Sequence, residues 1–235
     1  MQENGKIDQA KGALRYCLQK LAERDRFNVV TFSTTVNPFK DALVPATKDN
    51  VQAALAFVEK IEAGGGTAID EALDAALKPL AQPQGLPMVL FLTDGLPTVG
   101  ETNIETILAN AKNRNPSKAR IFAFGVGFDV NAHLLDRLAD EARGARDFVK
   151  PSENIELKVS NLYTKIANPV LSDVRVAFDG IKTEEVYPKQ SPDLFRGSQV
   201  VLLGRFDGQG EQSVRVSGKV GGKDKDYTYK VTWGE

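Results

Sequence analysis

The sequence has almost none of the residues from which disulfide frameworks and clustered metal sites are built. Its 235 residues include one cysteine, Cys17, and one histidine, His133. A lone cysteine excludes an internal disulfide framework and a cysteine-based zinc cluster, and a lone histidine excludes a multi-histidine metal site within one chain. We interpret Cys17, which lies beside an apolar helical stripe, as a small buried hydrophobe, and His133 as a half-exposed helical residue.

Long apolar runs and an excess of one charge are also absent. The longest apolar runs, 87–92 and 119–126, fall far below the ~20 residues of a membrane span, so we predict no transmembrane segment. No basic region followed by an apolar stretch opens the sequence, and we therefore predict no signal peptide within it. The 30 Lys and Arg face 31 Asp and Glu without forming a basic block, which argues against nucleic acid as a partner.

The composition is that of a globular protein, with 42% hydrophobic and 26% charged residues. Residues 1–168 alternate between amphipathic helical patterns and the short apolar runs of buried strands. We predict an α/β fold for this part, with a doubly wound, mostly parallel sheet covered on both faces. The expected strands are 27–32, 88–92, 120–126 and 147–150, with a short antiparallel edge strand in 36–44. The expected helices are 7–21, 48–61, 68–80, 104–112, 131–141 and 153–166.

The pattern changes at Asn168-Pro169, after which no helical periodicity appears. Four runs have the alternation or apolar content of strands and are separated by turn residues. These runs are 170–178, 199–205, 212–220 and 227–232. We therefore predict two domains, an α/β domain over 1–168 and a small all-β appendix over 169–235.

Motifs for catalysis are missing from the chain. No G-x-S-x-G elbow is present, and Gly221-Gly222-Lys223 lacks the first glycine and the Ser or Thr of a phosphate-binding loop. Gly125-Val126-Gly127 follows a strand, as in a dinucleotide fingerprint, but Val130 stands where the third glycine belongs. We predict that the chain is not an enzyme.

Two loops carry the remaining candidates for a binding site. In the first, Gly64, Gly65 and Gly66 allow a close backbone approach, and Thr67 then opens a helix, either as a plain N-cap or as a ligand. In the second, Asp94 follows a buried strand and precedes Gly95-Leu96-Pro97, either closing an Asx turn or facing a ligand. Because both loops are expected at the ligand edge of the sheet, a carboxylate and a hydroxyl there indicate a site for a hard cation.

These loops belong to a set of four separated motifs that match a known family. In chain order they are Asp25–Ser33 (DRFNVVTFS), Gly65-Gly66-Thr67, Leu92–Gly95 with Pro97-Thr98, and Phe124–Gly127. With these motifs the chain resembles a von Willebrand factor type A domain, in particular that of inter-alpha-trypsin-inhibitor heavy chains, over about residues 1–168. The β-rich appendix also resembles the segment that comes after that domain in heavy chains.

The resemblance implies a metal-ion-dependent adhesion site, in which three loops surround one Mg²⁺ or Mn²⁺. Thr67 matches the threonine of the second loop, and Asp94 matches the aspartate of the third. The Asp-x-Ser-x-Ser motif of the first loop, which ends a central strand in the family, is not found. The sequence opens with 1–6, the stretch that the resemblance places just after that motif, so we expect an N-terminally truncated fragment.

The missing loop and strand lead to two expectations. Mg²⁺ prefers six oxygens, and Thr67 and Asp94 supply two of them, so we expect weak metal binding or none. A missing central strand leaves two neighbouring strands with unpaired edges, which is costly when they are buried. Our hypothesis is that strand exchange between chains or an inserted appendix strand closes the gap, or that it stays open.

The function indicated by these observations is a metal-dependent protein-binding or adhesion module. Its partner is expected to present an Asp or Glu carboxylate, recognised by the loops that contain Gly64–Gly66 and Gly95–Pro97. One alternative is a Mg²⁺-dependent nucleotide-binding enzyme domain, in which Asp94 would hold the ion against phosphate. Another is a structural or assembly domain without metal. The compartment is left open, and only the family resemblance suggests a secreted or cell-envelope protein.

Overall fold

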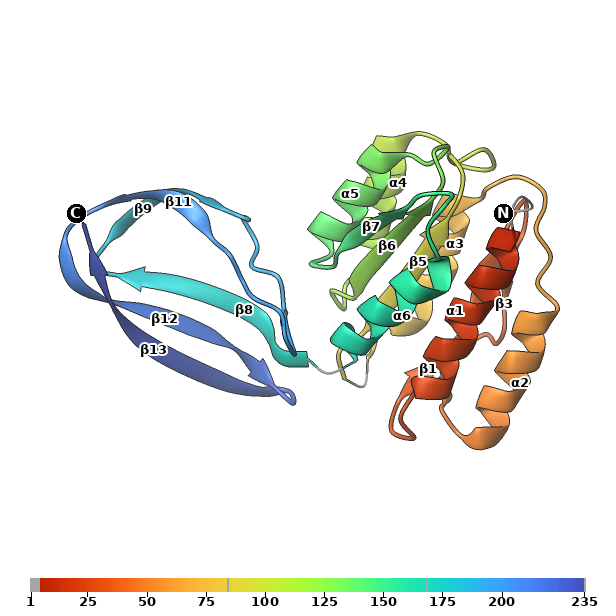
Figure 1. Ribbon diagram of the computed structural model, residues 1–235, viewed down its shortest axis with the longest axis horizontal. Coiled ribbons are helices and arrows are strands. Elements are labelled where there is room, and N and C mark those ends of the chain that lie inside the picture. The colour runs from red at the N-terminus through yellow and green to blue at the C-terminus, as the bar shows by residue number, and fades with distance from the viewer. Residues whose placement is uncertain (1–4, 84, 168, 235) are drawn as a thin grey trace. The chain divides into compact units, whose positions relative to one another are not determined.

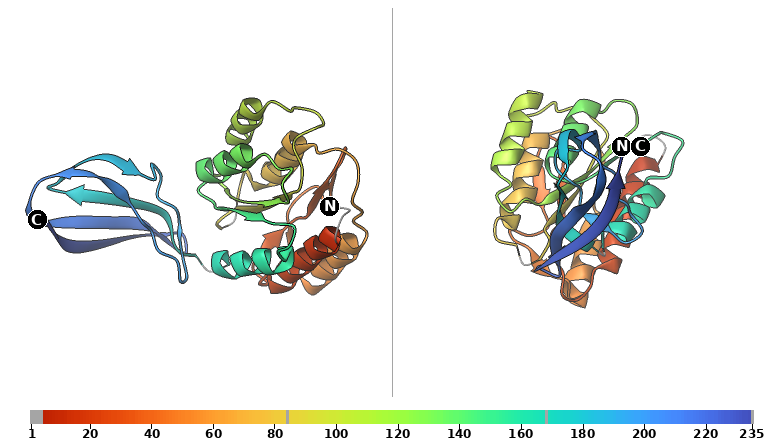
Figure 2. Two further views of the ribbon diagram at one scale, coloured as in Figure 1. Left: turned by 45° about the horizontal axis from the view of Figure 1, so that its top comes forward. Right: turned by 90° about the vertical axis from the view of Figure 1, so that its left-hand side faces the viewer.

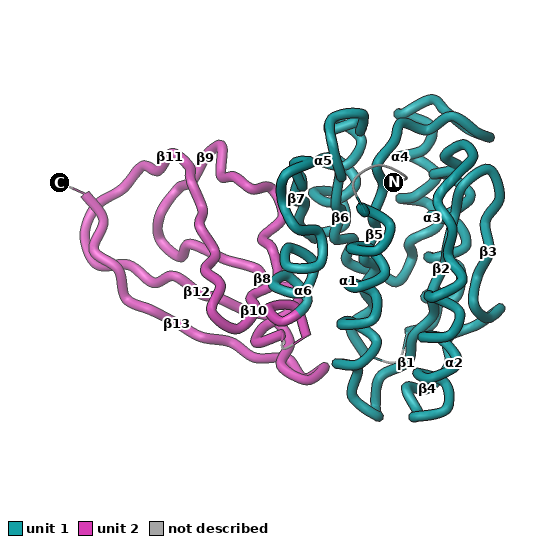
Figure 3. The backbone as a smooth tube through the Cα atoms, turned by 45° about the vertical axis from the view of Figure 1, so that its right-hand side comes forward, with its two compact units in different colours: residues 1–163 teal, residues 164–235 magenta. Residues whose placement is uncertain are grey.

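The computed structural model describes residues 5–83, 85–167 and 169–234. It divides into two compact units, Met1–Tyr163 and Thr164–Glu235 (Figure 3). The domain boundary expected from the sequence involves Asn168, which lies outside the described residues, and so it stays a prediction. The opening residues 1–4, to which the expected truncation refers, also lie outside them. Within the described residues, no helix is both long enough and apolar enough to cross a membrane.

The first unit contains alternating helices and strands. Its helices are α1 (Lys6–Lys20), α2 (Lys48–Glu59), α3 (Ile69–Leu77), the 3₁₀ helix η2 (Lys78–Leu80), α4 (Ile104–Asn113), α5 (Ala132–Glu141) and most of α6 (Ile155–Ile166), whose last residues fall in the second unit. Its strands are β1 (Arg26–Phe27), β2 (Val30–Phe32), β3 (Val36–Pro38), β4 (Val44–Pro45), β5 (Met88–Thr93), β6 (Arg120–Val126) and β7 (Arg146–Val149).

A parallel sheet of order β5-β6-β7 forms the centre of this unit. Every residue of β6 is buried, which explains why its sequence is a continuous apolar run apart from Arg120. Helices α3, α4 and α5 pack on one face of the sheet, while α1 and α6 cover the other (Figure 1). Residues of β6 alternate between these two cores, with Ile121 and Ala123 in one and Phe124 and Val126 in the other. The predicted α/β fold is therefore confirmed.

The segment 27–32 is not one buried strand, as the sequence suggested, but two short strands. The side chain of Asn28 interrupts it, because Asn28 Oδ1 accepts hydrogen bonds from the N–H groups of Val29 (2.9 Å) and Lys40 (3.1 Å). Its Nδ2 also donates to the carbonyl of Lys40 at 2.6 Å. As a result β1 pairs with β4, and β2 forms a separate antiparallel pair with β3.

Strands β2 and β5 lie near one another without pairing. The rings of Phe32 and Phe91 stack at 5.4 Å between centroids, so the two strands share one side-chain core. In the described part of the chain, however, β2 pairs with β3 alone and β5 with β6 alone. Leu90 of β5 is 37% exposed, which is unusual for an apolar residue of an inner strand. The two strands therefore present edges that no other strand of the described residues completes.

The second unit is built of antiparallel strands. They are β8 (Pro169–Asp179), β9 (Lys182–Tyr187), β10 (Leu194–Phe195), β11 (Leu203–Asp207), β12 (Gly210–Val220) and β13 (Lys223–Trp233). One sheet has the order β10-β8-β12-β13, and β9 pairs with β11. The sequence analysis missed β9, because Lys182–Tyr187 is mostly polar and exposed. It also placed the strand at 199–205, whereas β11 begins at Leu203.

Candidate functional site

The two candidate loops lie in contact in the first unit. The loop 94–100 follows β5, whose carboxyl end points the same way as that of β6, and the loop 64–68 precedes α3. A Cβ atom added at Gly95 would lie 3.0 Å from Thr67 Oγ1. The structure thus brings Thr67 against the residue that follows Asp94, and glycine at position 95 allows this close approach. Both Thr67 and Asp94 are half-buried.

Thr67 does not cap helix α3. The N-cap residue is Ala68, which makes no side-chain hydrogen bond. Of the two interpretations that the sequence left open for Thr67, the plain N-cap is therefore wrong. The structure gives the Thr67 hydroxyl no hydrogen bond within the described residues, while its backbone is firmly held. Its side chain can therefore serve a ligand without giving up an existing contact.

Thr98 holds the backbone of Thr67 from the neighbouring loop. The Thr67 N–H donates to Thr98 Oγ1 at 2.8 Å, and the Thr98 N–H donates to the Thr67 carbonyl at 3.1 Å. These reciprocal bonds tie the loop after β5 to the loop before α3. The sequence analysis quoted Thr98 only as part of a motif and assigned it no role. The sequence signal that could have indicated this role was a hydroxyl-bearing residue, Thr98, in a loop that follows a predicted strand.

The turn after β2 holds the glycine loop from the other side. Thr34 Oγ1 accepts from the Gly66 N–H at 2.9 Å, and the carbonyl of Ser33 accepts from the Ala68 N–H at 2.9 Å. Gly65 has a φ of 81°, and a Cβ there would lie 2.7 Å from Thr34 Oγ1. The glycines therefore let this loop pack closely on the β2–β3 turn. Gly64 and Gly65 are exposed, and Gly66 is half-buried.

The turn at Asp94 is closed by its neighbour Thr93. Thr93 is buried, and its Oγ1 lies 3.3 Å from both the N–H and the carbonyl oxygen of Gly95. The Thr93 hydroxyl therefore supports the turn that contains Asp94. Beyond this turn Leu96 is 48% exposed, and Pro97 is half-buried. Leu96 thus presents an apolar surface beside the candidate site.

Asp70 is a second carboxylate near Thr67, but its side chain bonds to residues at the end of α4. Asp70, in the first turn of α3, is buried, and its Oδ1 accepts from Asn110 Nδ2 at 3.0 Å. Its Oδ2 accepts from Arg114 Nη1 at 3.0 Å, and Arg114 also pairs with Asp74. Asp70 therefore fastens α3 to α4, which fixes the helix that begins directly after Thr67.

The donors in the two loops suit a hydrated Mg²⁺ or Mn²⁺. Asp94 offers a carboxylate and Thr67 a hydroxyl, both hard oxygen ligands, and Mg²⁺ commonly keeps several waters beside one or two carboxylates. Among the described residues no group of three or more His, Cys, Asp or Glu is placed to hold a metal. With two recognised protein oxygens, such an ion would keep most of its ligands as water.

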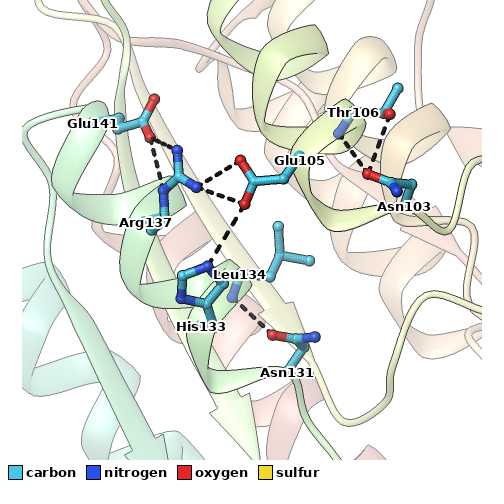
Figure 4. A network of polar contacts seen from close by, with 8 residues as sticks. All are labelled: Asn103, Glu105, Thr106, Asn131, His133, Leu134, Arg137 and Glu141. Carbon is cyan, nitrogen blue, oxygen red and sulfur yellow. Dashed lines mark hydrogen bonds and ion pairs between the residues drawn. The ribbon is translucent and has the colours of Figure 1, made fainter.

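A charged network lies between α4 and α5 (Figure 4). Arg137 Nη1 donates to both carboxylate oxygens of Glu105 at 2.8 Å, and Arg137 Nη2 donates to Glu141 at 2.8 Å. His133 Nε2 lies 3.8 Å from Glu105 Oε1, and its side chain is 65% exposed. Arg137 thereby lowers the pKa of Glu105. This exposed network links the two helices.

Comparisons with known proteins identify the family. A family model for the von Willebrand factor type A domain matches residues 1–148. Human inter-alpha-trypsin inhibitor heavy chain H4 is 34% identical over 225 residues, which make up 92% of this chain and 24% of that protein. The chain thus spans about a quarter of the length of the curated relatives that it matches.

Solved structures agree at the level of the fold. A von Willebrand factor type A protein from Catenulispora acidiphila has a TM-score of 0.72 at 20% identity, covering 99% of this chain and 63% of that chain. Proximal thread matrix protein 1 from the mussel byssus, described as having a zinc-occupied adhesion-site motif, has a TM-score of 0.50 at 20% identity, covering 68% and 41%. The family match, the similarity to a heavy chain and the shared fold confirm the resemblance seen in the sequence. The chain therefore belongs to the von Willebrand factor type A domain family and resembles inter-alpha-trypsin inhibitor heavy chains.

Proposed function

We propose that the first unit is a metal-dependent protein-binding module whose site is formed by Thr67 and Asp94. The observation that carries this proposal is the contact between the two loops, with Thr67 Oγ1 beside Gly95. Bound Mg²⁺ or Mn²⁺ would supply a positive centre that accepts a carboxylate of the partner as a ligand. The partner is accordingly a protein that presents an Asp or Glu side chain.

Each residue of the site has a distinct task in this proposal. Asp94 supplies the negative charge that attracts the cation, and Thr67 supplies a neutral oxygen. Thr98 and Thr34 hold the glycine loop on which Thr67 stands. Leu96, exposed at the same edge, gives the partner an apolar surface next to its carboxylate. The loops containing Gly64–Gly66 and Gly95–Pro97 would thus recognise the partner without any covalent chemistry.

The comparisons support this function more than its rivals. The heavy-chain relative and the von Willebrand factor type A match favour a binding module, and the mussel protein carries a metal in the corresponding kind of motif. A nucleotide-binding enzyme would need a phosphate-binding loop with a lysine, which the glycine loop lacks. A structural domain without metal is the remaining alternative. The same resemblance leads us to propose a secreted or cell-envelope protein.

The unpaired edges of β2 and β5 belong to the same proposal. We infer that an additional strand completes the sheet between them, because inner edges with unpaired backbone groups are costly. Strand exchange between chains would make the protein an oligomer. Addition of a short apolar peptide tests this idea: it should raise the melting temperature and protect amides of β2 and β5 from hydrogen exchange. A monomer with a cooperative melt and no added strand would contradict it.

The central experiment is a calorimetric titration of the chain with Mn²⁺. One-to-one binding is expected to be weak in the wild type and lost in Asp94→Asn. Asp49→Asn, which removes an exposed carboxylate from the first turn of α2, serves as the charge-matched control and should bind as the wild type does. Unchanged binding in Asp94→Asn would refute the site. Stabilisation by ATP or NAD without any response to Mn²⁺ would favour the nucleotide-binding alternative.

A further inference from the structure

Strand β13 ends its sheet with a long regular edge. All eleven residues pair with β12, from Gly210 opposite Trp233 to Val220 opposite Lys223, without a register shift. In the described residues no strand lies on its other side (Figure 2, left view, darkest blue). The strand contains neither proline nor a bulge, two of the devices that prevent edge pairing, but it carries a third device, charged side chains, in Lys223, Lys225 and Lys230. Its outer backbone groups are nevertheless available to another strand.

The two faces of β13 differ in chemistry. Tyr227, Tyr229 and Val231, which are 43%, 55% and 37% exposed, share one face with Trp233, and Lys223 and Lys225 lie at the other end of the same face. The opposite face carries charged and hydroxyl side chains. An apolar row at the free edge of a sheet favours a partner strand that extends the sheet, with apolar side chains beside the apolar face and polar side chains beside the polar face.

The sequence of β13 is complementary to itself. In the antiparallel register that pairs all eleven residues of two copies, Thr228 lies opposite Thr228 of the second copy. Asp226 then faces Lys230 of the second copy, so opposite charges meet twice across the two-fold axis. Tyr227 likewise faces Tyr229 of the second copy, which gathers four tyrosines on the apolar face. Such aromatic and opposite-charge pairs are the contacts that stabilise neighbouring strands.

Other registers lose these contacts. A shift that exchanges the two faces would set the apolar row of one copy beside the charged row of the other. Registers centred on Asp226 or Lys230 place like charges directly opposite each other. Registers centred on Tyr227 or Tyr229 keep the faces but pair fewer residues. The arrangement centred on Thr228 alone combines full length with two Asp226–Lys230 contacts.

We propose that two copies of this chain associate through their β13 edges, antiparallel and centred on Thr228. The four-stranded sheets of the two copies then form one continuous sheet of eight strands, four from each. The contact is isologous, because the same surface of both copies takes part, and it closes after two copies. The present partner of Lys230 is Glu211, at 2.8 Å, and both side chains are largely exposed, so Lys230 can exchange partners at small cost.

A charge exchange tests this register in the full chain. Analytical ultracentrifugation over a wide range of concentrations should show the wild type dimerising. Asp226→Lys and Lys230→Asp each create like-charge contacts and should each weaken dimerisation by about tenfold. The double variant Asp226→Lys/Lys230→Asp restores opposite charges and should recover the wild-type dissociation constant. Thermal melts of all four proteins verify that the single variants remain folded.

A cross-linking experiment gives an independent geometric test. Directly opposite residues of antiparallel strands have Cβ atoms about 4.5–5.5 Å apart, so Thr228→Cys should form a disulfide between copies when a mild oxidant such as diamide is added. In the same register the two Thr232 positions are separated by roughly 26 Å, eight residues along the strand. Thr232→Cys is therefore the matched control and should not cross-link.

Three results would overturn the proposal. One is a monomeric wild type at all concentrations, and another is a dimer that neither single charge variant weakens. The third is cross-linking of Thr232→Cys in preference to Thr228→Cys. A dimer formed by strand exchange at the β2–β5 edges would show the second result, so the two modes of association are distinguished.

Discussion

Thr98 and Thr67 are joined by two reciprocal hydrogen bonds, each donated by one residue's N–H to the other. The Thr67 N–H reaches the hydroxyl of Thr98 at 2.8 Å, and the Thr98 N–H reaches the carbonyl of Thr67 at 3.1 Å. One of these bonds depends on a side chain and the other only on the backbone. A substitution of Thr98 can therefore remove one anchor of the loop that carries Thr67 while keeping the other.

Replacement of Thr98 by valine should weaken Mn²⁺ binding by about fivefold, because the Thr67 N–H loses its acceptor while the side-chain volume stays similar. Thr98→Ser should restore most of the affinity. The control is Thr31→Val, which removes a comparable exposed hydrogen bond, 3.2 Å to the carbonyl of Asn37, away from the site. Calorimetry measures the affinities. Equal affinities for Thr98→Val and the wild type would show that Thr98 does not position Thr67.

Replacement of Asp70 by alanine should destabilise the chain by about 2–3 kcal/mol, because Asn110 and part of Arg114 lose a buried partner. The matched control is Asp136→Ala, which breaks the 2.6 Å contact between Arg146 and Asp136. Both of those side chains are about half exposed, so its cost should stay below about 1 kcal/mol. Urea unfolding measures both variants. Similar costs for the two substitutions would contradict the structural role given to Asp70.

Acid should weaken the α4–α5 network through Glu105. Arg137 holds the pKa of Glu105 below its ordinary value of 4.5. When folding lowers the pKa of a carboxyl group, the ionised group stabilises the folded state at pH values above its unfolded-state pKa. This stabilisation is lost as the pH falls through the folded-state pKa. The difference in melting temperature between wild type and Glu105→Gln should therefore be present at neutral pH and shrink below pH 4.5.

The exposed residue Glu62 supplies the control for this pH dependence. Glu62→Gln should leave the melting curve close to that of the wild type across the same pH range. A constant difference between wild type and Glu105→Gln down to strongly acidic pH would show that the ion pair does not stabilise the fold.

Cys17 should be unreactive in the folded protein. Burial raises the pKa of its thiol to about 12, and the side chain packs against the core formed by α1, α6 and the sheet. Because the thiolate is the nucleophile, alkylation by iodoacetamide at pH 8 should be at least about a hundredfold slower in buffer than in concentrated urea. Mass spectrometry follows the modification. Equal rates in the two conditions would contradict the burial of Cys17.

Local sequence patterns predicted the core of the fold. The continuous apolar run of β6 indicated a strand buried on both faces, and the structure shows all seven residues buried. Helices α4 and α5 begin at Asn103 and Asn131 caps, whose side chains accept from N–H groups three residues ahead. These features depend on near neighbours in sequence, and so composition and spacing sufficed to predict the strand at 120–126 and the helices at 104–112 and 131–141.

Local sequence patterns did not predict the elements that depend on contacts between residues far apart in the chain. Asn28 divides the segment 27–32 because it bonds to Lys40, twelve residues away. Strand β9 is polar along most of its length and is a strand only because β11 pairs with it. In each case the apolar pattern alone favoured the wrong boundary or no element.

For the candidate site, the sequence determined the residue types, a hydroxyl at Thr67 and a carboxylate at Asp94, and the family motifs that contain them. The tertiary structure decided which residues hold these two loops and bring them into contact. Thr34 and Thr98 hold the glycine loop from two sides, and Gly95 lets the two loops touch. These contacts join residues about 30 positions apart, and hydrogen bonds over that separation form only when the packed sheet and helices bring the loops together. Local sequence can therefore name the candidate ligands, whereas only the folded chain can place them.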